Sequence, residues 1–327
     1  MGWFGRKQKI EVDPLLGHPL IRRGLAAFKQ RDWLTLRELY DAQSPSDAYT
    51  FVGMLGLLTE LDEHMVELGE SATALILQAG IRMGWASRHR GPSVASMVTE
   101  SGVIGMVSNS ISAYDQLLQA AQLRPECSVI AAFRLAALIY LDGDREELAY
   151  AQDQFSASTA PRCWFYGYNH VTFETPKWHG SMDDMWQTAH IYADRPDNAA
   201  WIALLAKAHI EEWLYTVSMD DDKEAKKAYS DKRYSQAFRD ELVALDTRFW
   251  DHYGDVAMSH IEAVQAHNLM AFMHWRLGSK AQIGRHLDKI GTAMTEMPWG
   301  YLVREGQAAK MLARLRKQAG LGALESG

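Results

Sequence analysis

The sequence is poor in cysteine, and the chemistry that depends on cysteine pairs is missing with it. Among 327 residues the only cysteines are Cys127 and Cys163, separated by a helix-sized interval. Two isolated thiols provide no disulfide framework, and they lack the close paired spacing of a zinc motif. We therefore expect reduced thiols and a cytoplasmic protein.

Long apolar runs and an excess of basic residues are also missing. No stretch of about twenty apolar residues runs without a charge, so no membrane span is predicted. The net charge is −7, whereas binding to nucleic acid or to an anionic membrane favours a basic face. The glycine-rich loops that hold phosphates or dinucleotides do not occur. We expect no cofactor, no nucleic acid and no membrane among the ligands.

Alternation typical of strands is almost absent, with 171–173 the single short candidate. Helical spacing is common instead, because apolar residues recur at gaps of three and four and form stripes. The clearest stripe consists of Ile104, Val107, Ile111, Tyr114, Leu118 and Ala121. Further helices are expected at 20–28, 34–40, 131–141, 199–215 and 261–277. The sequence therefore predicts an all-α fold.

Four short turns can be superposed on one another, each opening a helix. Their second residue is always Asp or Ser, whose side chain accepts hydrogen bonds from the free N–H groups of a helix start. The four predicted caps are Asp32, Asp144, Ser181 and Ser279. In three of the turns an acid or amide follows three residues later, as in a capping box. These turns indicate a repeated helix–turn–helix unit.

The stretch TPKWHGSMDDM, residues 175–185, contains one of these turns but also resembles an active site. A Ser-His-Asp set needs side chains that converge, whereas neighbours on one turn mostly point apart. We interpret Gly180 as a permissive backbone position, Ser181 as the cap, and Asp183 and Asp184 as partners of the positive helix end. Trp178 is expected to cover the turn. The motif thus favours architecture over chemistry.

Residues 113–155 read as one helix ending at Leu-Arg-Pro and a second ending at Asp-Gly-Asp, which resembles a tetratricopeptide repeat. Over about 162–301 the sequence resembles an uncharacterised bacterial "domain of unknown function" family of tetratricopeptide-like proteins. Its members read Trp-Gly-Gly-Ser where this chain has Trp178 to Ser181, so His179 departs from the pattern. That resemblance implies a fold and no activity.

The predicted architecture is an irregular tetratricopeptide-like α-solenoid of antiparallel helix pairs. We expect a flexible N-terminus at 1–13, helical repeats at 14–160, a continuous second set at 161–318, and a flexible tail at 319–327.

Twelve histidines raise the question of a metal site. His260, His267 and His274 follow one another at intervals of seven, which is a rise of about 10.5 Å along a helix. Two nitrogens that share a zinc ion lie at most about 4 Å apart. These three histidines therefore cannot share an ion within their helix, and we interpret them as a polar stripe facing a groove or solvent. No metal site is predicted.

Aromatic residues with polar tips suit partner surfaces, and they equally suit a crowded core. Stacked helix pairs leave a concave groove, which predicts an interaction protein that binds a protein or peptide. The candidate groove residues are Trp164, Tyr166, Tyr168, His170, Trp178, His179, His209, Trp213 and His267. For His209 we favour burial among aromatics. An enzyme, such as a hydrolase with a pocket near Trp178, His179 and His209, is the alternative. A protein that neutralises a toxin or effector is the second alternative.

Overall fold

The computed structural model describes residues 11–60, 62–91, 97–253, 258–278, 280–303 and 306–322, and every regular element within these ranges is a helix. The prediction of an all-α fold is confirmed. The elements are α1 (Ile21–Gln30), α2 (Trp33–Asp41), α3 (Pro45–Leu58), η1 (Glu63–Leu68), α4 (Ala72–Arg90), α5 (Glu100–Leu123), α6 (Ser128–Tyr140), α7 (Arg145–Ala157), α8 (Trp164–Phe173), α9 (Met182–Ala193), η3 (Ala199–Ile202), α10 (Ala203–Ser218), α11 (Lys223–Tyr234), α12 (Gln236–Asp251), α13 (His260–Arg276), α14 (Lys280–Ile290), α15 (Glu296–Trp299) and α16 (Ala308–Gln318). The short strand considered at 171–173 is wrong, because these residues lie in α8.

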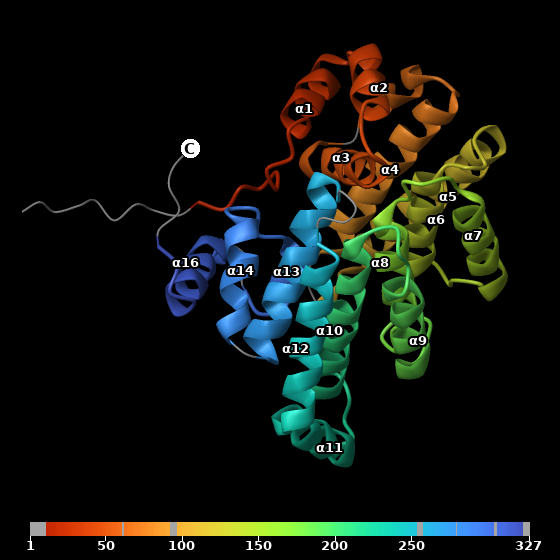
Figure 1. Ribbon diagram of the computed structural model, residues 1–327. Coiled ribbons are helices and arrows are strands. Elements are labelled where there is room, and N and C mark those ends of the chain that lie inside the picture. The colour runs from red at the N-terminus through yellow and green to blue at the C-terminus, as the bar shows by residue number, and fades with distance from the viewer. Residues whose placement is uncertain are drawn as a thin grey trace, which may run out of the picture.

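Consecutive helices pack mostly as neighbours, as in α3 with α4, α4 with α5, and α13 with α14. The chain also makes contacts between distant segments, since α3 packs against α13 (Figure 1). In an open array each repeat contacts only its neighbours. The residues predicted as first and second sets of repeats are therefore in direct contact in this fold. In the described ranges no helix combines the length and the apolar character needed to cross a bilayer.

The helix predicted from the stripe at 104–121 exists as α5, but a different face of it is buried. Ile104 is 61% exposed and Ile111 is 48% exposed. The buried side instead carries smaller residues such as Gly102, Ser110 and Ala113. Small side chains let the backbones of α4 and α5 approach closely, and this contact outweighs the burial of the larger apolar residues.

Three of the four predicted caps close the start of a helix. Asp32 accepts from Thr35 N at 3.1 Å, and Asp144 accepts from Glu146 N at 2.8 Å. Ser181 forms a full capping box with Asp184. The capping box expected at Asp144 does not form, because the Glu147 carboxylate pairs with Arg134 at 3.2 Å instead. The fourth cap, Ser279, lies outside the described residues.

Candidate metal centre

Six of the nine aromatic and histidine residues predicted to line a groove are core residues. Their exposed fractions are at most 7%, so they present no surface to a partner; they are Trp164, Tyr166, His170, His209, Trp213 and His267. Only Tyr168, Trp178 and His179 are partly exposed. The preferred interpretation of His209 is confirmed, since its ring packs edge-on against Trp186 and Phe238.

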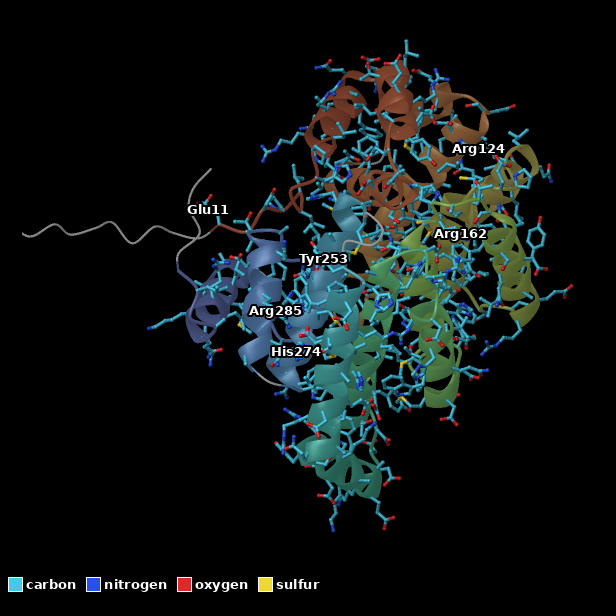
Figure 2. The ribbon with its side chains drawn as sticks, in the orientation of Figure 1. Glu11, Arg124, Arg162, Tyr253, His274 and Arg285 are labelled. Carbon is cyan, nitrogen blue, oxygen red and sulfur yellow. The ribbon has the colours of Figure 1, made fainter. Side chains whose placement is uncertain are left out.

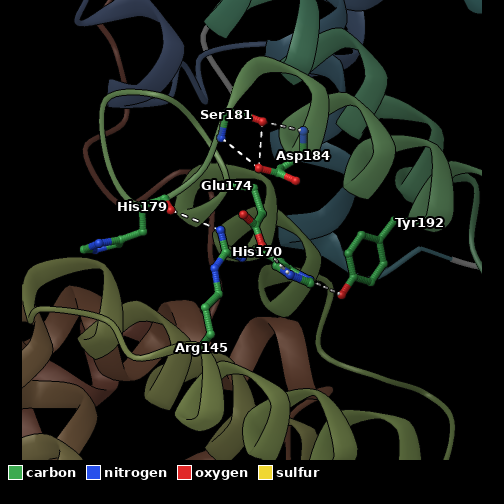
Figure 3. A network of polar contacts seen from close by, with 7 residues as sticks. All are labelled: Arg145, His170, Glu174, His179, Ser181, Asp184 and Tyr192. Atoms are coloured by element: carbon green, nitrogen blue, oxygen red, sulfur yellow. Dashed lines mark hydrogen bonds and ion pairs between the residues drawn. The ribbon is translucent and has the colours of Figure 1, made fainter.

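The TPKWHGSMDDM turn serves the main chain, as Figure 3 shows. Ser181 Oγ accepts from Asp184 N at 3.1 Å, and the Asp184 carboxylate accepts from Ser181 N at 3.1 Å. Arg145 binds the Glu174 carboxylate and donates to the carbonyl of His179 at 3.1 Å. A Cβ on Gly180 would lie 2.4 Å from the Glu174 carbonyl oxygen. Glycine is needed here for this close approach, rather than for the backbone freedom expected from the sequence.

The two histidines considered for a hydrolase pocket have partners on different helices. The His179 ring lies 3.2 Å from the carbonyl of Ile139 in α6. His209 Nε2 instead lies 3.4 Å from the carboxylate of Glu241 in α12. Among the described residues no hydrogen bond or ring contact joins the two imidazoles, whereas an enzyme site requires groups that converge.

A different set of side chains does converge, and it comes from three helices. Asp246 is on α12, His274 is on α13 and His286 is on α14; each offers one ligand atom, and these atoms lie within 4.8 Å of one another. The three side chains are at most 2% exposed. Figure 2 labels His274 with Arg285 and Tyr253, which lie in the same part of the molecule. Among the described residues this is the one group of three or more His, Cys, Asp or Glu side chains with such geometry.

The carboxylate of Asp246 is the centre of this cluster. Its Oδ1 accepts from His286 Nε2 at 2.7 Å, and its Oδ2 accepts from Arg285 Nη2 at 2.5 Å. Burial alone would raise the pKa of Asp246, but the neighbouring imidazoles of His274 and His286 outweigh it and hold this pKa below its ordinary value. Asp246 is therefore an anionic oxygen donor at neutral pH.

His274 is fully buried, yet neither of its ring nitrogens has a hydrogen-bond partner among the described residues. Its Nε2 faces Asp246 Oδ1 at 3.4 Å, which is within ion-pair range but does not satisfy hydrogen-bond geometry. A buried polar atom without a hydrogen-bond partner costs about 1–3 kcal/mol, and coordination of a metal ion is one interaction that offsets this cost. The sequence interpretation of His267 and His274 as a stripe facing groove or solvent is wrong, because both are buried.

The distances can be compared with those of a metal site. Zinc binds nitrogen and oxygen at about 2.0–2.2 Å, which places tetrahedral ligands about 3.3–3.5 Å apart. The separation of 3.4 Å between His274 and Asp246 already matches. The 2.7 Å bond between His286 and Asp246 has to open by about 0.6 Å to admit an ion. A single hydrogen bond is thus exchanged for coordination.

His267 lies behind His286 and outside the ligand set. Its Nδ1 is 2.9 Å from Nδ1 of His286. Burial lowers the pKa of His267 to about 3, with the neighbouring His286 adding to the effect, so the imidazole is neutral. When His286 binds a metal through Nε2, its Nδ1–H can donate to His267. Ligating histidines usually have such a partner, which fixes the ring and its tautomer.

Spacing along one helix could not reveal this cluster, because its ligands come from three helices. His274 lies two residues before the end of α13 and His286 lies six residues after the start of α14, so their positions in the sequence do not place them opposite each other. Asp246 lies on α12, which approaches only in the folded chain. Comparison with protein-family models, with curated proteins and with solved structures found no match.

Proposed function

We propose that the protein binds one divalent transition-metal ion through Asp246, His274 and His286, with zinc the best fit to these donors. The observation that carries the proposal is His274, a fully buried imidazole whose two ring nitrogens make no hydrogen bond and whose Nε2 lies 3.4 Å from an anionic carboxylate. Imidazole and carboxylate together suit zinc, and they also suit iron, copper and nickel. Calcium and magnesium favour sites made of oxygen alone.

The role that best fits this burial is a stabilising one. The three ligands come from α12, α13 and α14, so an ion ties three helices together at one point. Three protein ligands leave a fourth position, where a zinc-bound water would be a nucleophile at neutral pH. The ligands are at most 2% exposed, and Arg285 binds the second carboxylate oxygen of Asp246. This burial leaves little access for a substrate. Stabilisation therefore accounts for the geometry better than turnover does.

The test is metal content and stability of the purified chain. After removal of metals with a chelator, zinc is added and the bound metal is counted by mass spectrometry. We expect one equivalent of zinc, and at a hundredfold excess over Kd a stabilisation of about 2.7 kcal/mol. Cobalt in the same site should give the visible absorption bands of a tetrahedral complex.

Two variants make the test specific. His274→Leu should bind no zinc and show no cobalt bands, whereas His190→Ala, which changes an exposed histidine on α9, should behave as the wild type. Zinc binding that survives in His274→Leu, or a wild type that takes up no metal, would contradict the proposal.

Binding of a protein or peptide in a concave groove stays a prediction. Its remaining support is the partly exposed trio of Tyr168, Trp178 and His179.

A further inference from the structure

We propose that α10, α11 and α13 form a binding site for a small oxyanion, with Arg233, Arg276, Trp213 and Tyr229 as its donors. The site is separate from the metal centre and does not depend on it. It lies where α11 folds back beside the end of α10 (Figure 1). The ligand class is a phosphate or a carboxylate group.

The two arginines meet at the C-terminal end of α13. Arg233 Nη2 donates to the carbonyl of Arg276 at 2.7 Å. The Arg276 guanidinium lies over the Trp213 ring, with Cζ 4.6 Å from the ring centroid. Tyr229 and Arg233 are four residues apart on α11 and so share one face of it. The Glu212 carboxylate and, with smaller effects, both arginines are close enough to act electrostatically on the Tyr229 hydroxyl.

Three polar atoms at this place have no hydrogen-bond partner among the described residues. They are Trp213 Nε1, Tyr229 Oη and Arg276 Nε. Trp213 is 2% exposed and Tyr229 is 6% exposed, so solvent does not satisfy the indole and the hydroxyl. All three atoms carry a hydrogen they can donate. None of the three donates to the nearby Glu212 carboxylate, whose two oxygens accept from Lys232.

The charge of the cluster points the same way. Among the described residues neither Arg233 nor Arg276 forms a salt bridge with a carboxylate. The nearest acid on α10, Glu212, is held by Lys232 at 3.0 Å. The positive charges of Arg233 and Arg276 repel each other, and an oxyanion between them would offset that repulsion.

The chemistry of the donors defines the ligand. Guanidinium groups present a planar fork that matches carboxylate and phosphate oxygens, and the indole N–H and the phenol O–H each add one donor. The C-terminal end of α13 disfavours an anion, but one arginine already covers a carbonyl there and the other supplies a full positive charge. Because Trp213 and Tyr229 are buried, the site accepts a small group and not an extended polyanion.

The site is tested by isothermal titration calorimetry with inorganic phosphate and, separately, with acetate. The buffer is a cationic amine whose only anion is chloride. We expect saturable binding of at least one of the two ions, and the preferred ion tells a phosphate site from a carboxylate site. Arg276→Met keeps most of the side-chain stem over Trp213 and should weaken binding at least tenfold. Arg314→Met removes the same charge from an exposed position on α16 and should leave binding unchanged.

Tyr229→Phe provides a second variant in case Arg276→Met does not fold. It removes one unpartnered oxygen, so the anion-free protein should be at least as stable as the wild type while its anion affinity falls severalfold. The proposal is overturned by a wild type that binds neither ion saturably. Equal weakening in Arg276→Met and Arg314→Met would overturn it as well, since binding would then reflect overall charge.

Discussion

Two buried carboxylates lie at the same long helix, α13, and their hydrogen-bond surroundings differ. Glu262 belongs to α13 and Asp246 faces it from α12. Glu262 near its start is 5% exposed and is saturated by neutral donors: Ser46 Oγ at 2.5 Å, Asn198 Nδ2 at 2.7 Å and Ser259 N at 2.9 Å. Asp246, which faces the later part of α13, is 1% exposed and has an arginine and two imidazoles around it. One of these imidazoles has no hydrogen bond.

The difference separates structure from ligand binding. Around Glu262 the three donors share one acceptor carboxylate, and these residues join α3, η3 and α13. A structural role as a link between distant segments is enough to explain this network. Around Asp246 three nitrogens face the carboxylate, and one of them, His274 Nε2, makes no hydrogen bond with it. A saturated buried network is complete without a ligand, whereas an unsaturated one leaves polar atoms that a ligand can bind.

The largest effect that this comparison predicts is for Glu262→Ala. The change leaves buried Ser46 and the half-buried Asn198 and Ser259 amide without their acceptor, and a fully buried unpaired polar group costs about 1–3 kcal/mol. We expect the free energy of unfolding to fall by about 3 kcal/mol, measured by urea denaturation. Glu38→Ala on the exposed side of α2 is the matched control and should change it by less than about 0.5 kcal/mol. A cost for Glu262→Ala as small as that of the control would break the comparison.

The turn at Gly180 is held by contacts to the main chain, and its test is steric. In Gly180→Ala the new Cβ would meet the Glu174 carbonyl oxygen at 2.4 Å, so backbone has to move. We expect a loss of about 2 kcal/mol in thermal or urea unfolding, as for overpacking elsewhere. Gly53→Ala is the control of opposite sign, because Gly53 is inside α3 and its Cβ would meet nothing within 4 Å. That variant should gain about 0.5–1 kcal/mol. Similar changes in both variants would show that the turn is not tightly built.

These regions also show what the sequence could and could not predict. Helix starts depend on neighbours along the chain, so Asp32, Asp144 and Ser181 were identifiable as caps from local spacing alone. The fold class followed from periodicity for the same reason. The buried face of α5 was not identifiable, because it depends on how closely α4 approaches.

The candidate metal centre could not be predicted from the sequence either, because its ligands come from three helices. Spacing on one helix correctly separates His267 from His274, but it carries no information about Asp246, which another helix supplies. Nor could spacing reveal that an imidazole lacks a partner, since that depends on every element around it. Sites of this kind are visible only once packing has been determined.

The smallest expected effect is the sharpest test of the comparison. In the metal-free protein His274→Leu should cost about 1 kcal/mol in urea unfolding, because His274 Nε2 makes only a 3.4 Å ion-pair contact with Asp246 and leucine has a similar volume. His286→Leu should cost about 2 kcal/mol under the same conditions, since it breaks the 2.7 Å bond to buried Asp246. Added zinc should not raise the free energy of unfolding of either variant. If His274→Leu is as costly as Glu262→Ala without metal, the imidazole already has a structural role and the cluster is not awaiting a ligand. A nearly silent substitution that nevertheless abolishes the zinc effect would mean that His274 is buried for the metal alone.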